Sequence, residues 1–441
     1  MTAKSSLLVQ DKRTAQRNAA ERRFIWYGKA AIAVSLAALV LLLVSIFGNG
    51  LSSYRQTFLT LTVELPEAKL DKSGVRDPAV MSKVTTIGYA PLLTNALIAK
   101  MEELGIEKTL SDKDLADIIS KEAPATLRNI VLADPSLIGG TITLPVLASG
   151  RIDGFFKGRV SMESAALDNN TSPEALVIAQ QLSDAGVLTT RFNWGFLTAP
   201  DASDQRPEAA GLGVAILGSL YMMIVVLALA LPIAVAASIY LEEFAPKNCW
   251  TDLIEVNIAN LAAVPSIVYG ILGLAIFINF GHLNQSSPLV GGLVLSLMTL
   301  PRIIIPARAA LKSVPPSIRD AALGVGASKM QSVFHHVLPL AAPGILTGVI
   351  IGLAQALGET APLLLIGMVA FVRDYPAAFP DSSHIFGDPA TALPVQVYNW
   401  TQRADPAFVE RASGAIIALL IFLMAMNLVA ILLRRRFERR W

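Results

Sequence analysis

The sequence predicts an all-α integral membrane protein with six transmembrane helices and one folded α+β insert between the first two helices. Composition is the first observation behind this prediction. Of the 441 residues, 53% are hydrophobic and only 16% are charged, whereas soluble domains carry about 25% charged residues. The second observation is that six segments contain the roughly 20 apolar residues needed to cross a bilayer. Backbone polar groups in lipid need partners within the same segment, so these segments are expected to be helices.

We expect spans at residues 30–47, 211–241, 256–280, 288–310, 341–370 and 413–433. Because the last five spans follow one another closely, the chain has five parts. The parts are a basic N-terminus (1–29), a first transmembrane helix (30–50), a soluble insert (51–209), a membrane domain with five helices (210–433) and a basic tail (434–441).

Lysine and arginine residues gather at both ends of the chain. Seven lie in the first 29 residues, and five arginines follow the sixth span. Because such residues accumulate on the cytoplasmic side of a membrane, both termini are expected to be cytoplasmic and the insert to lie outside. The first span is expected to be an uncleaved anchor, since its basic segment is long and no clear small-x-small cleavage site follows it.

Composition disfavours several classes of function. The net charge of only +2 gives nucleic-acid binding no electrostatic support. The single cysteine, Cys249, permits neither an internal disulfide framework nor a cysteine-based metal site. The four histidines form no H-E-x-x-H pattern, and neither a nucleophile elbow nor a dinucleotide fingerprint is present. We therefore expect no catalytic residue, no metal site and no cofactor in this chain.

The insert has the composition of a soluble domain, with 20 acidic and 15 basic residues. Residues 59–66 alternate with period two and predict a strand. Residues 111–123 and 168–182 predict amphipathic helices, the second with Ser172 as its N-cap. At about 160 residues, the insert is long enough to bury a core of its own. It is expected to be either a folded cap or a sensing or docking surface, and to be dispensable for the chain's basic activity.

A charged segment with glycines, residues 319–344, separates the fourth span from the fifth. Pro315 and Pro316 are expected to end the fourth helix, because proline cannot donate a backbone hydrogen bond. Residues 317–320 read as a capping box that starts a short helix. Ala321 and Ala322 would give that helix a small-residue face that another protein can approach closely.

Two glycines then break this short helix. Gly324 and Gly326 are expected to form the turn, and a second short helix is expected to end at Leu338-Pro339. Two other interpretations fit this segment less well. The segment lacks the G-x-x-x-x-G-K-[ST] spacing and the preceding strand of a phosphate-binding loop. An ordinary connector, for its part, has no need of so many residues with a glycine break.

This hairpin resembles the EAA loop of ABC-transporter permease subunits, whose pattern is E-A-A, three residues, G, nine residues and I-x-L-P. The matching residues are Asp320, Ala321, Ala322, Gly326, Leu338 and Pro339. Asp320 replaces the usual glutamate, and His336 stands where an aliphatic residue is usual. The resemblance implies that the hairpin docks on a separate ATPase subunit and couples ATP-driven closure to movement of the spans.

Three further stretches are similar to the PstA-type phosphate permease. They are "SIYLEEFAPKN" (238–248), "AAVPSIVYGILGL" (262–274) and "ALGETAPLLLIGM" (356–368). The resemblance covers about half of the chain, residues 210–433. It implies the ABC importer permease fold in a bacterial inner membrane, and inorganic phosphate as substrate. The implied partners are a PstC-type permease subunit, an ATPase subunit dimer that binds ATP, a periplasmic phosphate-binding protein and membrane lipid.

Two ionisable residues are expected within the spans. Arg302 lies in the fourth span and Glu359 in the fifth, where a charge costs about 2.5–3.5 kcal/mol on insertion scales. We expect both, with Thr360, on the translocation path; the alternative is a fixed ion pair that holds two spans together. Gly344, Gly348 and Gly352 predict close packing against another helix rather than exposure to lipid, and Pro265 and Pro301 are expected to interrupt their spans.

Two other functions remain open from the residues. A permease for a different oxyanion, such as sulfate or molybdate, would share every feature except the resemblance of residues 358–362, which favours phosphate. A membrane sensor would share the anchor, the external domain and the second span. No signalling output domain follows those elements, however, and four more spans do.

Overall fold

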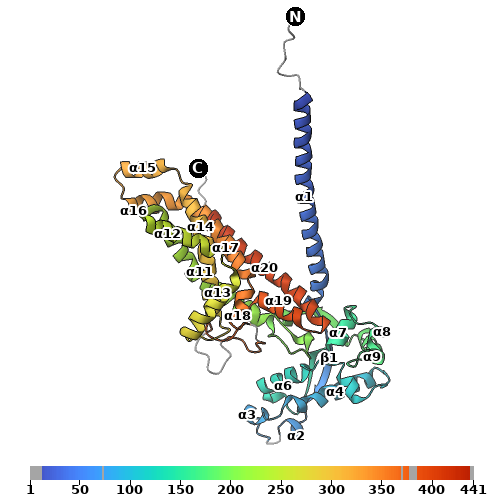
Figure 1. The fold of residues 1–441 in the computed structure, drawn as a ribbon. Coiled ribbons are helices and arrows are strands. Elements are labelled where there is room, and N and C mark those ends of the chain that lie inside the picture. The colour runs from blue at the N-terminus through green and yellow to red at the C-terminus, as the bar shows by residue number, and fades with distance from the viewer. Residues whose placement is uncertain (1–11, 72–73, 369–370, 377–384, 438–441) are drawn as a thin grey trace. The chain divides into compact units, whose positions relative to one another are not determined.

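The computed structural model describes residues 12–71, 74–368, 371–376 and 385–437, and these are mostly helical (Figure 1). The chain forms two compact units, Met1–Asn49 and Gly50–Trp441. The first contains nearly all of α1 (Lys12–Gly50). This helix therefore begins inside the segment expected to be a basic N-terminus, of which residues 1–11 lie outside the described part.

Among the described residues, five helices are long and apolar enough to cross a membrane, and a bent pair adds a sixth if it counts as one span. The membrane elements after the insert are α11 (Gly213–Ile239), η4 (Tyr240–Phe244), α12 (Cys249–Ala262), α13 (Ser266–Gly273), η5 (Leu274–Phe280), α14 (Pro288–Lys312), α17 (Leu338–Gly358), α18 (Ala361–Leu365) and α20 (Pro406–Phe437). The bent pair, residues 249–280, turns by 102° before Ser266. Pro265 causes the break, because it lacks a backbone N–H and its ring disfavours helix in the residue before it.

Several boundaries in the membrane domain differ from those expected. Pro301 does not interrupt its span, since α14 continues through it. The fifth span ends as a helix at Gly358 rather than near 370, and residues 369–370 lie outside the described part. Leu338-Pro339 does not end a helix either. The chain stays helical from Lys329 to Gly358, because the wider π-helical turn η6 (Val333–Val337) accommodates the ring of Pro339.

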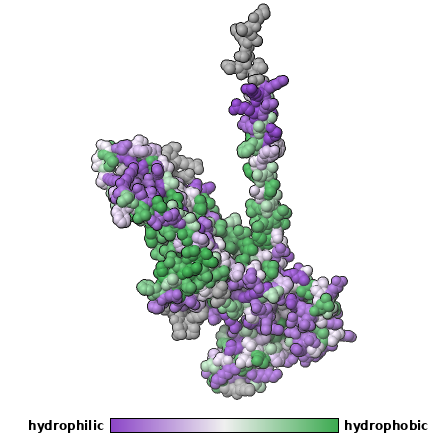
Figure 2. Space-filling model, in the orientation of Figure 1, coloured by the Kyte–Doolittle hydropathy of each residue, from purple (hydrophilic) through white to green (hydrophobic). Residues whose placement is uncertain are grey.

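The hairpin between the fourth and fifth spans consists of α15 (Pro316–Gly324) and α16 (Lys329–Ser332), which we call the α15–α16 hairpin. After the fifth span, α19 (Leu393–Gln402) precedes α20. Figure 1 shows the α15–α16 hairpin and the C-terminal end of α20 at one end of the membrane domain, and the insert at the other. On the face shown in Figure 2, hydrophobic residues cover the membrane helices, while hydrophilic residues cover the insert and the hairpin.

The insert is an α+β unit built on a three-stranded antiparallel sheet in the order β2-β1-β3. The strands are β1 (Arg55–Glu64), β2 (Thr141–Leu147) and β3 (Leu188–Phe192). The helices are η1 (Leu51–Tyr54), α2 (Glu67–Leu70), α3 (Pro78–Met81), α4 (Thr86–Glu103), α5 (Asp112–Ala116), α6 (Ala123–Ala133), η2 (Pro135–Leu137), α7 (Gly150–Phe156), α8 (Met162–Ala165), α9 (Pro173–Asp184), α10 (Trp194–Thr198) and η3 (Pro207–Ala209). Leu59, Leu61 and Val63 of β1 are fully buried in the core, as the period-two pattern predicts.

The two helices expected in the insert differ in outcome. The helix α9 has the predicted cap, since the Ser172 hydroxyl accepts a hydrogen bond from the Ala175 N–H. The helix expected over 111–123 is confined to α5. The chain leaves it because Ile119 forms a β-bridge with Ala148, and the Ser120 N–H donates to the Leu147 carbonyl. Pairing with the end of the sheet thus ends the helix early.

Close packing of α17 on α14 depends on the three glycines spaced four residues apart. A Cβ atom at Gly344 would lie 2.6 Å from the Ala310 side chain, and one at Gly348 would lie 2.6 Å from the Pro306 ring. At Gly352, the nearest side-chain atoms of Ile303 would lie 3.1 Å away. The glycine face therefore contacts protein rather than lipid, as expected.

Gly348→Ala tests this packing. The added methyl group would overlap Pro306, so we expect the free energy of unfolding to fall by about 1–3 kcal/mol, typical of an overfilled core. Gly358→Ala is the matched control in the same helix, because nothing lies within 4 Å of a Cβ there. Thermal unfolding of the purified proteins in detergent would show it. Equal unfolding temperatures for the two variants would contradict the packing account.

Candidate functional site

The α15–α16 hairpin is capped differently from the expectation. Pro315 is the N-cap of α15, and no side chain caps that helix, so residues 317–320 do not form a capping box. Within this segment, the Arg319 guanidinium donates to the Glu243 carboxylate and to the Val314 carbonyl. The capping box lies at α16, where the Ser328 side chain and the Gln331 side chain each bond to the other's backbone N–H. The S-x-x-Q pattern of residues 328–331 was the signal for it.

The residues that match the EAA pattern lie on two sides of the hairpin. Ala322 is buried. The residues Asp320, Ala321 and Gly326 are exposed, while Leu338 and Pro339 are half-buried. Gly326 has a φ of +90°, a conformation that glycine adopts without strain. His336 is exposed and thus does not enter the packing beneath the second helix.

The outer side of the hairpin exposes large apolar side chains. They are Leu323, Val325, Met330 and Phe334, and Val325 is 86% exposed. Figure 2 shows that the surrounding surface of the hairpin is otherwise hydrophilic. An apolar group within a polar rim is typical of a surface that binds another protein.

The structure brings Arg302 and Glu359 together. The Arg302 Nη1 atom lies 3.4 Å from the Glu359 Oε1 atom, and both side chains are about four-fifths buried. Glu359 is not in mid-helix as expected. It is the C-cap of α17, with an extended backbone, and Thr360 follows it as the N-cap of α18. The break gives this segment backbone groups without helical partners, which a membrane protein tolerates only where they contact protein or line a wet cavity.

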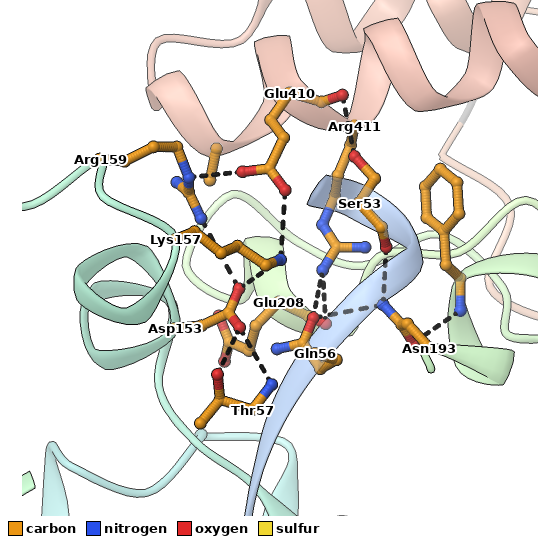
Figure 3. Close-up of polar contacts among 12 residues, drawn as sticks. Ser53, Gln56, Thr57, Asp153, Lys157, Arg159, Asn193, Glu208, Glu410 and Arg411 are labelled. Atoms are coloured by element: carbon orange, nitrogen blue, oxygen red, sulfur yellow. Dashed lines mark hydrogen bonds and ion pairs between the residues drawn. The ribbon is translucent and has the colours of Figure 1, made fainter. Parts of the chain in front are cut away.

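A buried cluster of charged side chains joins the insert to the membrane domain (Figure 3). Sequence reasoning missed it. The cluster contains Asp153, Lys157, Arg159, Glu208, Glu410 and Arg411. The signal was present at the start of the last apolar segment, where the adjacent charges of Glu410 and Arg411 precede the expected span at 413.

Asp153 and Glu410 share the same two cations. The Lys157 Nζ atom lies 2.7 Å from the Asp153 Oδ2 atom and 3.1 Å from the Glu410 Oε1 atom. Arg159 forms a second ion pair with Glu410. The other carboxylate oxygen of Asp153 accepts hydrogen bonds of 3.0 Å from the N–H and hydroxyl of Thr57 in β1. The start of α20 is thereby linked to α7 and to the sheet of the insert.

Arg411 ties three segments together from α20. Its guanidinium donates to the carbonyls of Ala210 and Glu208, at 2.6 and 2.8 Å, just before α11 begins. It also donates to the Gln56 side-chain oxygen in β1 at 3.1 Å. The insert is thus fixed to both the first and the last helix of the membrane domain after residue 210.

These contacts change the expectation for removal of the insert. Deleting residues 51–209 would remove the ion-pair partners of Glu410 and would leave Arg411 with the Ala210 carbonyl alone. We therefore expect the membrane domain to be unstable without the insert, although the sequence pointed to a dispensable one.

Glu208 gives the junction a dependence on pH. Burial raises the pKa of its carboxyl group above the ordinary value of 4.5, and the Ser120 hydroxyl, which donates to it at 2.5 Å, opposes that change. The folded protein then retains a proton that the unfolded chain releases. Its stability should therefore decrease as pH rises from about 4.5 toward the raised pKa.

Glu208→Gln should remove that decrease, because the amide has the same shape and does not ionise. We expect the variant to gain unfolding temperature relative to the unaltered protein as pH increases from 4.5 to 8. The measurement is thermal unfolding in detergent at a series of pH values, with Glu163→Gln, at an exposed position of the insert, as the control. Parallel profiles for Glu208→Gln and the unaltered protein would show that burial does not raise the pKa of this carboxyl group.

The described residues include no group of three or more His, Cys, Asp or Glu side chains placed to hold a metal ion.

Known proteins match the chain in two regions. Residues 209–441 match the family described as "binding-protein-dependent transport system inner membrane component", and residues 11–166 match a domain of unknown function, DUF3333. Among the solved structures, a chain of the MetNI methionine ABC transporter has 16% identity and a TM-score of 0.37, covering 52% of this chain and 95% of its own. A likeness of that size supports no argument about the fold.

Curated relatives are more informative. The probable ABC transporter permease protein YqgI of Bacillus subtilis is 31% identical over 50% of this chain and 78% of its own length. The phosphate transport system permease protein PstA 2 of Mycobacterium bovis is 30% identical, over 57% of this chain and 79% of its own. PstA of Mycobacterium leprae is also 30% identical, over 54% and 75%. These relatives confirm the predicted similarity to PstA-type permeases. The chain belongs to the family of binding-protein-dependent transport system inner membrane components.

Proposed function

We propose that this chain is the transmembrane permease subunit of an ATP-driven importer of inorganic phosphate. The observation that carries the proposal is the 30% identity to phosphate transport system permease proteins over at least three quarters of their length. The apolar helices agree with it, since they make the chain a multi-pass membrane protein.

The chain supplies the path and not the energy. ATP would be bound by a partner ATPase subunit dimer, which would contact the apolar outer side of the α15–α16 hairpin. A PstC-type permease subunit would complete the membrane part, and a periplasmic phosphate-binding protein would deliver the ion. The arginines after the last span support a cytoplasmic C-terminus. Arg434, Arg435 and Arg436 lie in the last turn of α20, at the end that lies near the hairpin in Figure 1, so the insert would be periplasmic.

Arg302 and Glu359 are proposed to lie on the translocation path, together with Thr360. A guanidinium offers an anion two parallel donors, and here it sits beside a break in a membrane helix. The Nη1–Oε1 separation of 3.4 Å is longer than that of a strong charged hydrogen bond. An anion can therefore compete with Glu359 for Arg302, and Glu359 would be released as the anion binds.

Arg302→Lys and Glu359→Gln test this path. We expect each to lower the uptake of labelled phosphate at least tenfold in a strain that lacks its own phosphate permease, while the complex still assembles. Arg302→Lys keeps the charge but loses the two-donor geometry. The charge-swapped double variant decides between the alternatives. Recovery of uptake in the swap would show that the pair only holds two segments together.

Val325→Asp tests the ATPase contact. A carboxylate introduced into an apolar protein contact would be buried without a partner, so we expect the ATPase to be lost from the complex purified through this chain. Gly326→Pro should act similarly, because proline cannot adopt a φ of +90°. Val75→Asp is the matched control, since Val75 is an exposed valine of the insert. If the Val325→Asp complex retains as much bound ATPase as the unaltered complex, this surface is not where the ATPase docks.

A further inference from the structure

One side chain ties the α15–α16 hairpin to the ends of two membrane helices. Arg319 of α15 forms an ion pair with Glu243 of η4, with its Nε atom 3.2 Å from both carboxylate oxygens and its Nη2 atom 2.5 Å from Oε1. The same guanidinium donates to the carbonyls of Leu311 and Val314, at 2.9 and 2.7 Å. The Leu311 carbonyl lies in the last turn of α14 and the Val314 carbonyl just after that helix, where the regular pattern of helical N–H donors has ended.

The adjacent carboxylate continues the contact to another helix. Glu242 of η4 pairs with Arg308 of α14, with 3.3 Å between Oε2 and Nη2. The same Nη2 atom lies 2.6 Å from the Glu255 Oε1 atom in α12. Four elements are therefore joined by one series of ion pairs: α15 through Arg319, η4 through its two glutamates, α14 through Arg308 and α12 through Glu255.

Apolar contacts also pack the hairpin against the ends of these membrane helices. Ile318 of α15 packs against the buried cluster that Ile239 of α11, Leu311 of α14 and Val337 of η6 form, and Ala322 of the same helix is buried. The Lys329 ammonium of α16 lies 5.3 Å from the centre of the Phe244 ring in η4. The π-helical end of α11 thus meets both helices of the hairpin.

We infer that Arg319 and Glu243 are positioning residues that transmit movement of the α15–α16 hairpin to α11, α14 and α12. The inference rests on the proposed function, since it names how the ATPase contact reaches the helices. A short helix seated by apolar contacts alone could tilt without moving its neighbours. The guanidinium prevents this, because its planar donors hold a carboxylate and two carbonyls in one geometry.

The direction of the side chain separates this role from docking. Glu243 is nearly fully buried, and Arg319 turns toward it and toward the end of α14. Val325 lies on the outer face of the hairpin, away from this ion pair. Loss of the Arg319–Glu243 pair should therefore uncouple ATP hydrolysis from transport and should not release the ATPase.

The test compares Arg319→Gln, Arg319→Lys and Glu243→Gln in the complete complex reconstituted in liposomes. Three quantities are measured: bound ATPase, ATP hydrolysed and phosphate accumulated. We expect the ATPase to remain bound and ATP to be hydrolysed, while phosphate accumulated per ATP falls at least tenfold in Arg319→Gln. In Arg319→Lys this ratio should fall less, because lysine can keep the ion pair but cannot hold both carbonyls. Lys312→Gln removes an exposed cation near the same helix end, and it should leave the ratio unchanged.

Two results would overturn the inference. One is an unchanged ratio of phosphate to ATP in Arg319→Gln. The other is loss of the ATPase from the complex, which would make Arg319 a docking residue. If Arg319→Gln fails to assemble, Glu243→Gln decides alone, since it retains the bonds from Arg319 to the carbonyls of α14. Absence of ATP-dependent phosphate uptake in the unaltered complex would refute the proposed function instead. The unaltered complex thus distinguishes that failure from a failure of the inference about Arg319.

Discussion

The close approach of α14 to its two neighbours is the constraint on which the rest of the membrane domain depends. Gly348 and Gly352 let α17 lie against one side of α14, and Gly291 and Gly292 bring α14 to within contact of Met222 and Val225 in α11. Apolar side chains gain little from association within lipid, so close backbone packing stabilises such a bundle. With α14 held centrally, its two arginines, Arg302 and Arg308, reach partners on three other segments.

Several ion pairs of the membrane domain lie where a helix begins, ends or breaks. Arg302 meets Glu359 at the gap between α17 and α18, and Arg308 and Arg319 meet carboxylates at the π-helical end of α11. At the opposite end, the start of α20 carries Glu410 and Arg411 into the insert. Buried ion pairs contribute little net stability but cost much when one partner is removed. These ion pairs fix which segments stay together. The domain is therefore held by ion pairs at both ends and by close helix packing in the middle.

Sequence reasoning predicted the elements that follow from local patterns. The helical state of the apolar segments, the period-two strand β1, the cap at Ser172 and the glycine face of α17 each depend on a few neighbouring residues, and they agree with the structure, although several span boundaries do not. Prolines were less informative, since Pro265 breaks a helix whereas Pro301 and Pro339 lie within helices. Their effect depends on whether the surrounding turns can widen or bend.

The contacts that hold the functional regions were beyond the reach of sequence. Arg319 and Glu243 are 76 residues apart, and Lys157 and Glu410 are 253 residues apart, so no periodicity connects them. The early end of α5 likewise follows from pairing of Ile119 with Ala148. The EAA pattern identified the hairpin but could not show that Ala322 faces inward while Val325 faces outward.

The substrate is the central claim, and its most direct measurement is selective uptake by the purified complex. Liposomes containing this chain, its permease partner and the ATPase would be loaded with ATP and supplied with the binding protein and labelled phosphate. The account predicts accumulation of phosphate that requires both ATP and the binding protein, and that excess sulfate or molybdate does not reduce. ATP-dependent accumulation of sulfate or molybdate in place of phosphate would contradict it.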